Sequence, residues 1–362
     1  MPPGSGAKLQ TLAASAAAEY GTGMSDDDTG SGGRGFVTAE DVARHAGVSR
    51  SAVSRTFTEG ASVSERVRQR VLKAAAALGY RVNRLAQGLI HQHSNLVGVL
   101  GANLQAPYMA GQVDALSQAL LREGMQCLLL NAADAENNIT RLIDRILEFR
   151  ARAIVILSGA PSSSIVRECI ANGVRLILVN KVVEGARTDA ILGDNAAGAR
   201  QAAELLIETS CRRPAIVSTG EGTASLIQRS EAAAACFSAA GLTPVCWSRG
   251  GVSYETGAAA ARELLEAQGI DGAFCVTDLL ALGFLDAVRD SGRRVPEDVQ
   301  VIGFNDIPQA SWGAYQLTSV RLPIDVLTQA VMDAILREGS TSKPMRRLLP
   351  LTLIERATTR RA

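Results

Sequence analysis

Arginine and hydroxyl side chains share one face of a short helix that we predict near residue 52 of this 362-residue chain. The face consists of Arg50, Ser51, Ser54 and Arg55. Arg can donate two hydrogen bonds to a guanine edge in the major groove of DNA, and Ser can reach either a base or a phosphate. We therefore expect Arg50, Ser51 and Arg55 to read bases, and Ser49 and Ser54 to hold phosphate groups.

The residues before this face predict a helix-turn-helix. Thr38 and Asp41 have the three-residue spacing of a capping box, which starts a first helix. Gly47 ends that helix, and Ser49 caps the next one. Two short helices joined by a turn that contains glycine describe a helix-turn-helix, in which Thr38 is a further candidate for contact with the DNA backbone.

A third helix gives this pair its core. We predict that it begins after Ser64 and ends at Gly79. Its buried stripe is expected to consist of Val67, Val71, Leu72 and Leu78.

Charge favours a nucleic-acid partner over an ordinary helical subdomain with solvated arginines. Residues 36–95 hold nine Lys or Arg against four Asp or Glu, whereas residues 96–362 hold 26 against 28. A chain with a formal net charge of +1 thus concentrates its positive charge in one short region, as expected of a module that contacts phosphates.

The distribution of histidine and cysteine limits the chemistry of the remaining chain. All three histidines, His45, His91 and His93, precede residue 94, so a Ser-His-Asp or Cys-His apparatus or a His-ligated metal is excluded beyond it. The six cysteines are scattered without paired spacing, which predicts neither a zinc site nor a disulfide framework. We expect no metal, no cofactor and no catalytic residue.

Apolar runs alternate with helical periods from residue 96 onward, which predicts parallel sheets covered on both faces. About 265 residues exceed one doubly wound domain, so we expect two lobes with a ligand cleft at the carboxyl ends of their strands. The runs begin at Leu96, Cys127, Ala153, Leu176, Ala215, Ala273 and Val299.

The N-terminal segment and the absence of long apolar runs indicate where in the cell the protein is expected. Residues 1–35 are rich in Gly, Ser, Ala and Asp and are expected to be disordered. No run approaches the roughly 20 apolar residues of a membrane span, and no continuous apolar region indicates a signal peptide. We expect a cytoplasmic protein without a membrane partner.

Several motifs in residues 38–86 occur in the order and spacing of a known headpiece. They are Thr38-Ala-Glu-Asp-Val-Ala43, Ala46-Gly-Val-Ser49, Val53-Ser-Arg55, Val63-Ser-Glu65, Leu78-Gly-Tyr80 and Asn83-Arg-Leu-Ala86. Over these nearly fifty residues the chain resembles the family of the lac repressor and purine repressor, the LacI family. The resemblance implies a homodimer that binds double-stranded operator DNA and a small-molecule effector.

The resemblance also implies a hinge at residues 83–95. In this family, two hinge helices pack together in the minor groove and wedge a leucine between base steps, which corresponds here to Leu89 beside Ala86. Asn83 is expected to cap that helix and contact the backbone of the DNA. The alternative is that Leu89 is a linker residue packed on the core.

Motifs that follow the predicted strands resemble the effector-binding core of the family more loosely. The matching arginine and aspartate grip ligand hydroxyls, which points to Arg229 and Asp278, with Tyr108, Asn180 and Asn305 as lesser contacts. The alternatives are a solvated helix residue for Arg229 and a helix cap for Asp278. Val252 stands where an aromatic residue often stacks on a sugar, which weakens the case for a simple pyranose.

The sequence therefore predicts a small all-α helix-turn-helix domain followed by an α/β core of two doubly wound parallel-sheet lobes, similar to periplasmic binding proteins. We expect a DNA-binding regulator, a repressor rather than an enzyme, that responds to a sugar-like, polyol or sugar-acid effector. The alternatives are a solute-binding protein of a transport system and an α/β enzyme that acts on sugars. The expected segments are a tail (1–35), a DNA-binding domain (36–82), a hinge (83–95), lobe 1 (96–192 plus 321–340) and lobe 2 (193–320 plus 341–362).

Overall fold

The computed structural model divides the chain into two compact units, residues 1–83 and 84–362, each of which is described by itself. The predicted hinge residues Asn83, Ala86 and Leu89, and the expected disorder of residues 1–35, lie outside the described residues. The structure describes residues 36–58, 60–82, 94–132, 135–159, 161–183, 185, 187–220, 222–267, 269–337 and 343–361.

The described part of the first unit consists of helices α1 (Ala39–Ala46), α2 (Arg50–Thr56) and α3 (Glu65–Leu78), as the sequence predicts. Thr38 and Asp41 form the expected capping box, and Gly47 ends α1 with a left-handed φ of 59°. Ser49 caps α2 through a bond from the Ala52 N–H. Ser64 occupies the cap position of α3 but its side chain makes no capping bond.

One small core holds these helices together. Val42, Val53 and Val71 are buried in it, one from each helix. The predicted buried stripe of α3 is wrong at Leu72, whose side chain is 41% exposed. Ala74 and Ala75 are buried instead, because positions 71, 74, 75 and 78 follow the helical period and position 72 does not.

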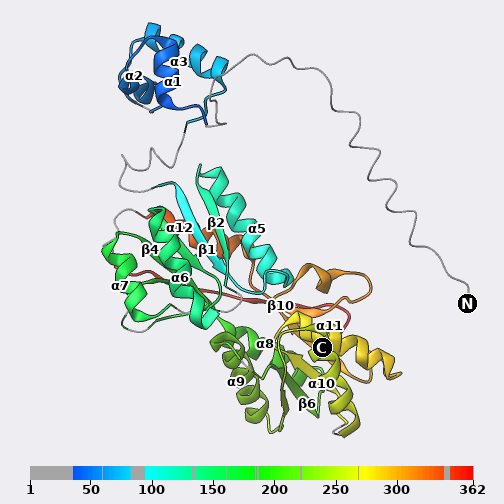
Figure 1. The fold of residues 1–362 in the computed structure, drawn as a ribbon. Helices are drawn as coiled ribbons and strands as arrows, with labels where there is room; N and C mark the ends of the chain where they lie inside the picture. The colour runs from blue at the N-terminus through cyan, green and yellow to red at the C-terminus, as the bar shows by residue number, and fades with distance from the viewer. Residues whose placement is uncertain are drawn as a thin grey trace, which may run out of the picture. The chain divides into compact units, whose positions relative to one another are not determined.

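The second unit begins with a lobe built on a six-stranded parallel sheet in the order β11-β5-β4-β3-β1-β2 (Figure 1). Successive residues of β1 face opposite sides, so Val99 packs with α5 and α12 whereas Leu100 packs with α6 and α7. Both faces of the sheet are therefore buried. The elements are β1 (Leu96–Gly101), α5 (Pro107–Arg122), β2 (Gln126–Asn131), α6 (Ala135–Glu148), β3 (Ala153–Ile156), α7 (Ser163–Ala171), β4 (Arg175–Val179), β5 (Asp189–Gly193), α12 (Ile324–Leu336) and β11 (Arg346–Leu349).

The second lobe has a sheet in the order β12-β10-β9-β8-β6-β7, in which the pair β10–β12 is antiparallel. Helices α8 and α9 pack together on one face, and α10 and α11 pack together on the other (Figure 1). The elements are α8 (Asn195–Glu208), β6 (Pro214–Ser218), α9 (Ala224–Ala239), β7 (Val245–Ser248), α10 (Tyr254–Ala267), β8 (Gly272–Cys275), α11 (Asp278–Asp290), β9 (Gln300–Phe304), the 3-10 helix η1 (Pro308–Ser311), β10 (Thr318–Arg321) and β12 (Thr352–Ile354).

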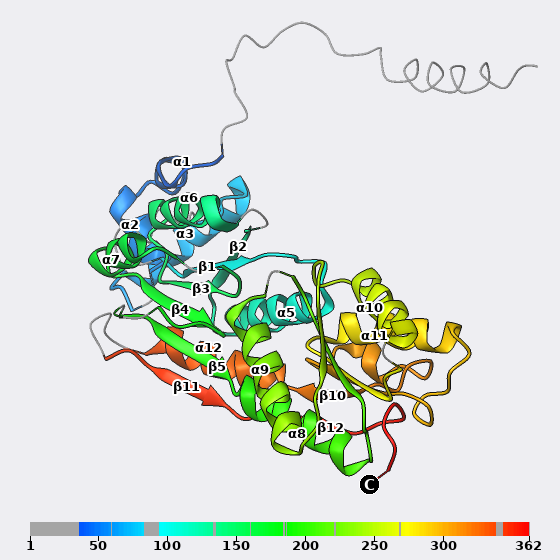
Figure 2. The same ribbon diagram turned by 90° about the horizontal axis from the view of Figure 1, so that it is seen from below.

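The chain passes between the lobes at three places, after β5, after β10 and after β11 (Figure 2). The predicted assignment of residues 341–362 to lobe 2 is wrong for β11, which pairs with β5 of the first sheet. The buried Asp189 explains this placement, because its carboxylate accepts from the Met345 N–H at 2.6 Å and pairs with Arg175 and Arg337. Among the described residues, no helix is both long and apolar enough to cross a membrane.

Candidate functional site

The polar face of α2 is open to solvent. Arg50, Ser51 and Arg55 are exposed, and Ser54 is half-buried. The guanidinium groups of Arg50 and Arg55 form no ion pair or hydrogen bond within the described part of the chain; the described ion pairs of this unit join Arg44 to Asp41 and Arg68 to Glu65. The guanidinium groups of Arg50 and Arg55 are thus available to a partner.

Other basic residues of the unit hold its fold. Arg70 donates to the carbonyl oxygens of Ala46 and Gly47, which closes the end of α1. Arg68 Nη1 donates to the carbonyl oxygen of Thr56 at 3.1 Å. Positive charge is therefore divided between residues that pack the helices and residues that face solvent on α2.

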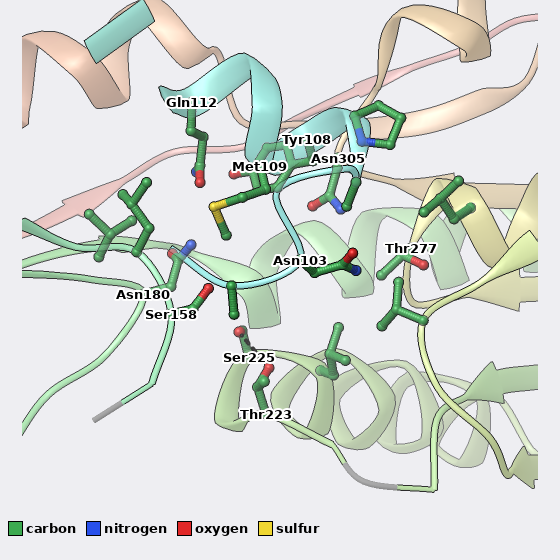
Figure 3. Close-up of a pocket in the computed structure, with 18 of the residues that line it drawn as sticks. Asn103, Tyr108, Met109, Gln112, Ser158, Asn180, Thr223, Ser225, Thr277 and Asn305 are labelled. Atoms are coloured by element: carbon green, nitrogen blue, oxygen red, sulfur yellow. Dashed lines mark hydrogen bonds between the residues drawn. The ribbon is translucent and has the colours of Figure 1, made fainter. Parts of the chain in front are cut away.

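A cavity of about 680 Å³ lies in the second unit between the two lobes. It opens at the carboxyl ends of β1, β3, β4, β8 and β9, which is where open α/β sheets bind their ligands. The structure brings all five predicted effector residues to its wall: Tyr108, Asn180, Arg229, Asp278 and Asn305. Figure 3 shows Asn103, Tyr108 and Asn305 around the same space.

Arg229 is only 5% exposed and is held by three residues that are far apart in the sequence. Its Nε donates to Asn195 Oδ1 and its Nη1 donates to the Val276 carbonyl, both at 2.8 Å. The guanidinium lies over the Phe304 ring, 3.6 Å from the ring centroid. Burial lowers the pKa of Arg229 to about 10, which leaves it charged at neutral pH. The alternative of a solvated helix residue is wrong.

Asp278 is fully buried and is the first residue of α11, whereas Thr277 caps the helix. Its Oδ1 accepts from Ser319 Oγ at 2.6 Å and its Oδ2 accepts from the Ile307 N–H at 2.8 Å. Burial raises the pKa of Asp278 to about 6. Each oxygen keeps one lone pair, so the carboxyl can still accept a bond from a ligand hydroxyl.

Three asparagines follow strands at the wall of the cavity, and all have positive φ: Asn103 (52°), Asn180 (56°) and Asn305 (109°). Asn tolerates this conformation better than most residues, so each chain can turn sharply after its strand. Asn180 Oδ1 accepts from the Gly193 N–H at 3.0 Å. Its side chain also interacts with the Tyr108 hydroxyl at the wall of the cavity.

The wall of the cavity also holds polar side chains that were not predicted as effector contacts. Lys181 directly follows Asn180, and Gln112 lies one helical turn after Tyr108, so neighbouring positions gave a signal for both. Burial raises the pKa of Tyr108, which keeps its hydroxyl protonated as a donor. The missed polar residues are Asn103, Gln112, Ser158, Lys181, Thr223, Ser225 and Thr277.

Comparison with known proteins decides the family. Residues 38–83 match the lacI family of bacterial regulatory proteins, and residues 203–359 match a periplasmic binding protein-like domain. The transcriptional regulator CelR of Thermobifida fusca is 31% identical over 331 residues, which are 88% of this chain and 97% of CelR. This chain belongs to the lacI family. It is a DNA-binding transcriptional regulator and not an enzyme.

Solved structures of lacI-family proteins have the same fold. The lac repressor dimer bound to operator and an anti-inducer superposes with a TM-score of 0.81 at 24% identity, covering 90% of this chain and 99% of that one. The complex of CelR with cellobiose has a TM-score of 0.64 at 30% identity, covering 89% and 99%. The regulator GalS of Salmonella typhimurium is 28% identical over 305 residues, 83% of this chain and 90% of its own.

Proposed function

We propose that this lacI-family protein is a repressor that binds a pseudo-palindromic operator as a homodimer and is controlled by a small polyhydroxy effector. The observation that carries the proposal is the pairing of two sites in one chain. An exposed basic face lies on α2, and a polar cavity lies between two lobes. One helix-turn-helix reads a half-site, so a symmetric dimer supplies the second contact.

The roles of the residues follow from their chemistry. Arg50, Ser51 and Arg55 read bases, while Thr38, Ser49, Ser54 and Asn83 hold the backbone of the DNA. In the cavity Arg229 donates, Asp278 accepts and the asparagines do both, which suits a ligand with many hydroxyl groups. The lac repressor bound to operator and CelR bound to cellobiose support both halves of the proposal.

Selection of genomic DNA fragments by the full chain tests the proposed function. We expect enrichment of short sites with two-fold symmetry, and the genes beside them indicate the effector. Sedimentation of the protein with one such site should give two chains per duplex. A selection that enriches no common sequence, or one chain per site, would contradict the proposal.

The hinge has its own test. Leu89→Ala should weaken binding to the selected site much more than binding to random DNA, because a wedge contributes only where the duplex bends. The effector affinity of this variant should equal that of the wild type. Equal losses on both DNAs would show that Leu89 is a linker residue.

A further inference from the structure

Helix α5 begins at the cavity without a cap. Ala106 stands at its cap position and has no side chain that can accept a hydrogen bond, and Pro107 follows. The backbone N–H groups of Tyr108 and Met109 have no hydrogen-bond partner among the described residues. Free N–H groups and the positive end of a 16-residue helix therefore meet the cavity, an arrangement that favours a bound anion.

The side chain of Gln112 is a second, independent indication that a hydrogen-bond acceptor binds at the start of α5. Its side chain is 5% exposed and lines the cavity one turn along α5, as Figure 3 shows. The Tyr108 hydroxyl lies beside this amide, but Nε2 makes no hydrogen bond of normal geometry within the described part of the chain. A buried donor without a well-placed partner destabilises the free protein, so a ligand acceptor at this place removes a penalty that the free protein carries.

Lys181 adds a positive charge to the wall of the cavity. It is half-buried, and no described residue forms an ion pair or hydrogen bond with it. Burial lowers the pKa of its amine, because the cation loses water without gaining a partner. An anion beside Lys181 would restore the stability of the charged form.

The described wall of the cavity carries little negative charge. Asp278 is the one Asp or Glu among the described residues of the wall, and both of its oxygens already accept hydrogen bonds. Lys181 and Arg229 stand against it. Helix α9 also begins at the cavity without a side-chain capping bond from Thr223. Positive charge at the described wall of the cavity therefore exceeds negative charge.

We propose that the effector is a polyhydroxy compound that carries an oxyanion, a carboxylate or a phosphate ester, held in lobe 1 by the first turn of α5, Gln112 and Lys181. The inference rests on the proposed function and names the class of effector. Arg229, Asp278 and Asn305 of lobe 2 bind the hydroxyl groups of the same molecule. The ligand therefore spans the two lobes.

Thermal unfolding of the full chain with matched sets of compounds tests the inference. Each set holds a neutral sugar, its aldonic acid and its terminal phosphate ester, for the common hexoses and pentoses. We expect an acid or a phosphate to raise the melting temperature and to bind at least about 10-fold more tightly than its neutral counterpart. The member that binds distinguishes carboxylate from phosphate.

Two substitutions locate the anion. Lys181→Gln should weaken binding of the stabilising compound about 10- to 100-fold, as expected for loss of a hydrogen bond to a charged group. Lys343→Gln removes the same charge from an exposed residue outside the cavity and should change nothing. Gln112→Leu should raise the melting temperature without ligand, since the unpaired donor is gone, and should weaken binding.

The outcomes separate the inference from the proposed function. Equal binding of neutral and anionic members, stabilisation by no anionic member, or full affinity in Lys181→Gln would overturn the inference. Operator binding by the same preparations is measured alongside. Its persistence would leave the proposed DNA-binding function in place, and its loss would count against that function.

Discussion

Four successive residues at the end of β9, residues 303–306, have different surroundings. A Cβ at Gly303 would lie 2.2 Å from Asp278 Oδ1, so glycine leaves room for that buried carboxyl. Phe304 lies beneath the Arg229 guanidinium, and Asn305 lines the cavity. Asp306 is 4% exposed at its side chain and pairs with Arg321 and Arg356. The short motif thus supports both polar anchors of lobe 2.

The carboxyl of Asp278 makes the stability of the protein depend on pH. Its pKa of about 6 in the folded chain lies above the ordinary value of 3.8. The stabilisation of the protonated form is therefore complete below about pH 4 and is lost as the pH rises through about 6. We expect Asp278→Asn, which stays neutral, to remove up to about 3 kcal/mol of this dependence.

Chemical unfolding at several pH values between 4 and 7 measures this effect. Asn can still accept from the Ile307 N–H and can donate to Ser319 Oγ, so the fold should persist. The free energy of unfolding of the wild type should fall relative to that of the variant across this window. Parallel curves would mean that the carboxyl is ionised throughout.

Arg55 is the residue on which base reading can be tested most directly. Arg55→Ala should cost about 1–3 kcal/mol on the selected operator and relax the preference at one base pair. Arg44→Ala is the control, because Arg44 is also exposed but pairs with Asp41 on α1. Gel-shift titration against single-base variants gives the answer. A uniform loss on every sequence would assign Arg55 to phosphate contact instead.

At the scale of elements, α10 and α11 pack closely through two glycines. A Cβ at Gly283 would lie 1.8 Å from the Tyr254 carbonyl oxygen, and one at Gly257 would lie 2.0 Å from the Leu280 carbonyl oxygen. These contacts are with backbone, which cannot move aside as a side chain can. The close approach holds the start of α11, and with it Thr277 and Asp278, at the cavity.

Gly283→Ala should therefore destabilise the protein. Helix propensity favours Ala by about 1 kcal/mol, but overpacking against backbone costs about 1–3 kcal/mol or more, so the clash decides the sign. Gly251→Ala is a matched control in the same lobe, because nothing lies within 4 Å of its Cβ position. Denaturant unfolding compares the two. Equal stability of both variants would show that α10 and α11 can separate freely.

The elements also show what the sequence predicts and what it does not. Caps and glycine ends locate α1, α2 and α3, because these signals are local. Seven strands are found from their apolar runs, among them most of the buried central ones. The strands β5, β7, β10, β11 and β12 were not predicted. Of these, the edge strand β7 holds two exposed residues and the edge strand β11 begins with Arg346 and Arg347. Their place depends on contacts far along the chain.

The residues of the cavity also differ in how well the sequence predicts them. Arg229 and Asp278 were predicted from the resemblance to the family, whereas Gln112 was not predicted although it lies one helical turn after Tyr108. Its unpaired donor is a property of packing and cannot be seen in the sequence. The second-lobe assignment of β11 failed for a related reason, because the buried Asp189 that anchors Met345 is more than 150 residues away.

At the scale of the whole molecule, the proposed DNA-binding residues and the proposed effector-binding residues lie in different units. Arg55 lies in the first unit and Arg229 in the second. Distant sites without shared partners act nearly independently, so a change in one unit should leave the binding constant of the other within about twofold. In the proposed function, communication between the sites depends on the bound effector, whose contacts with both lobes are expected to favour one closure of the cavity.

A pair of opposite variants tests this division. Arg229→Lys keeps the charge but loses the guanidinium that donates to Asn195 and Val276. It should therefore weaken effector binding and abolish the influence of the effector on operator affinity, while operator affinity without effector stays unchanged. Arg55→Ala should weaken operator binding and leave effector affinity unchanged. In the wild type the effector that stabilises the protein should shift operator affinity by about 1–3 kcal/mol. Calorimetry measures the effector affinity of the three proteins, and gel shift measures their operator affinity with and without effector. An effector that binds the wild type tightly without changing its operator affinity would contradict the coupling.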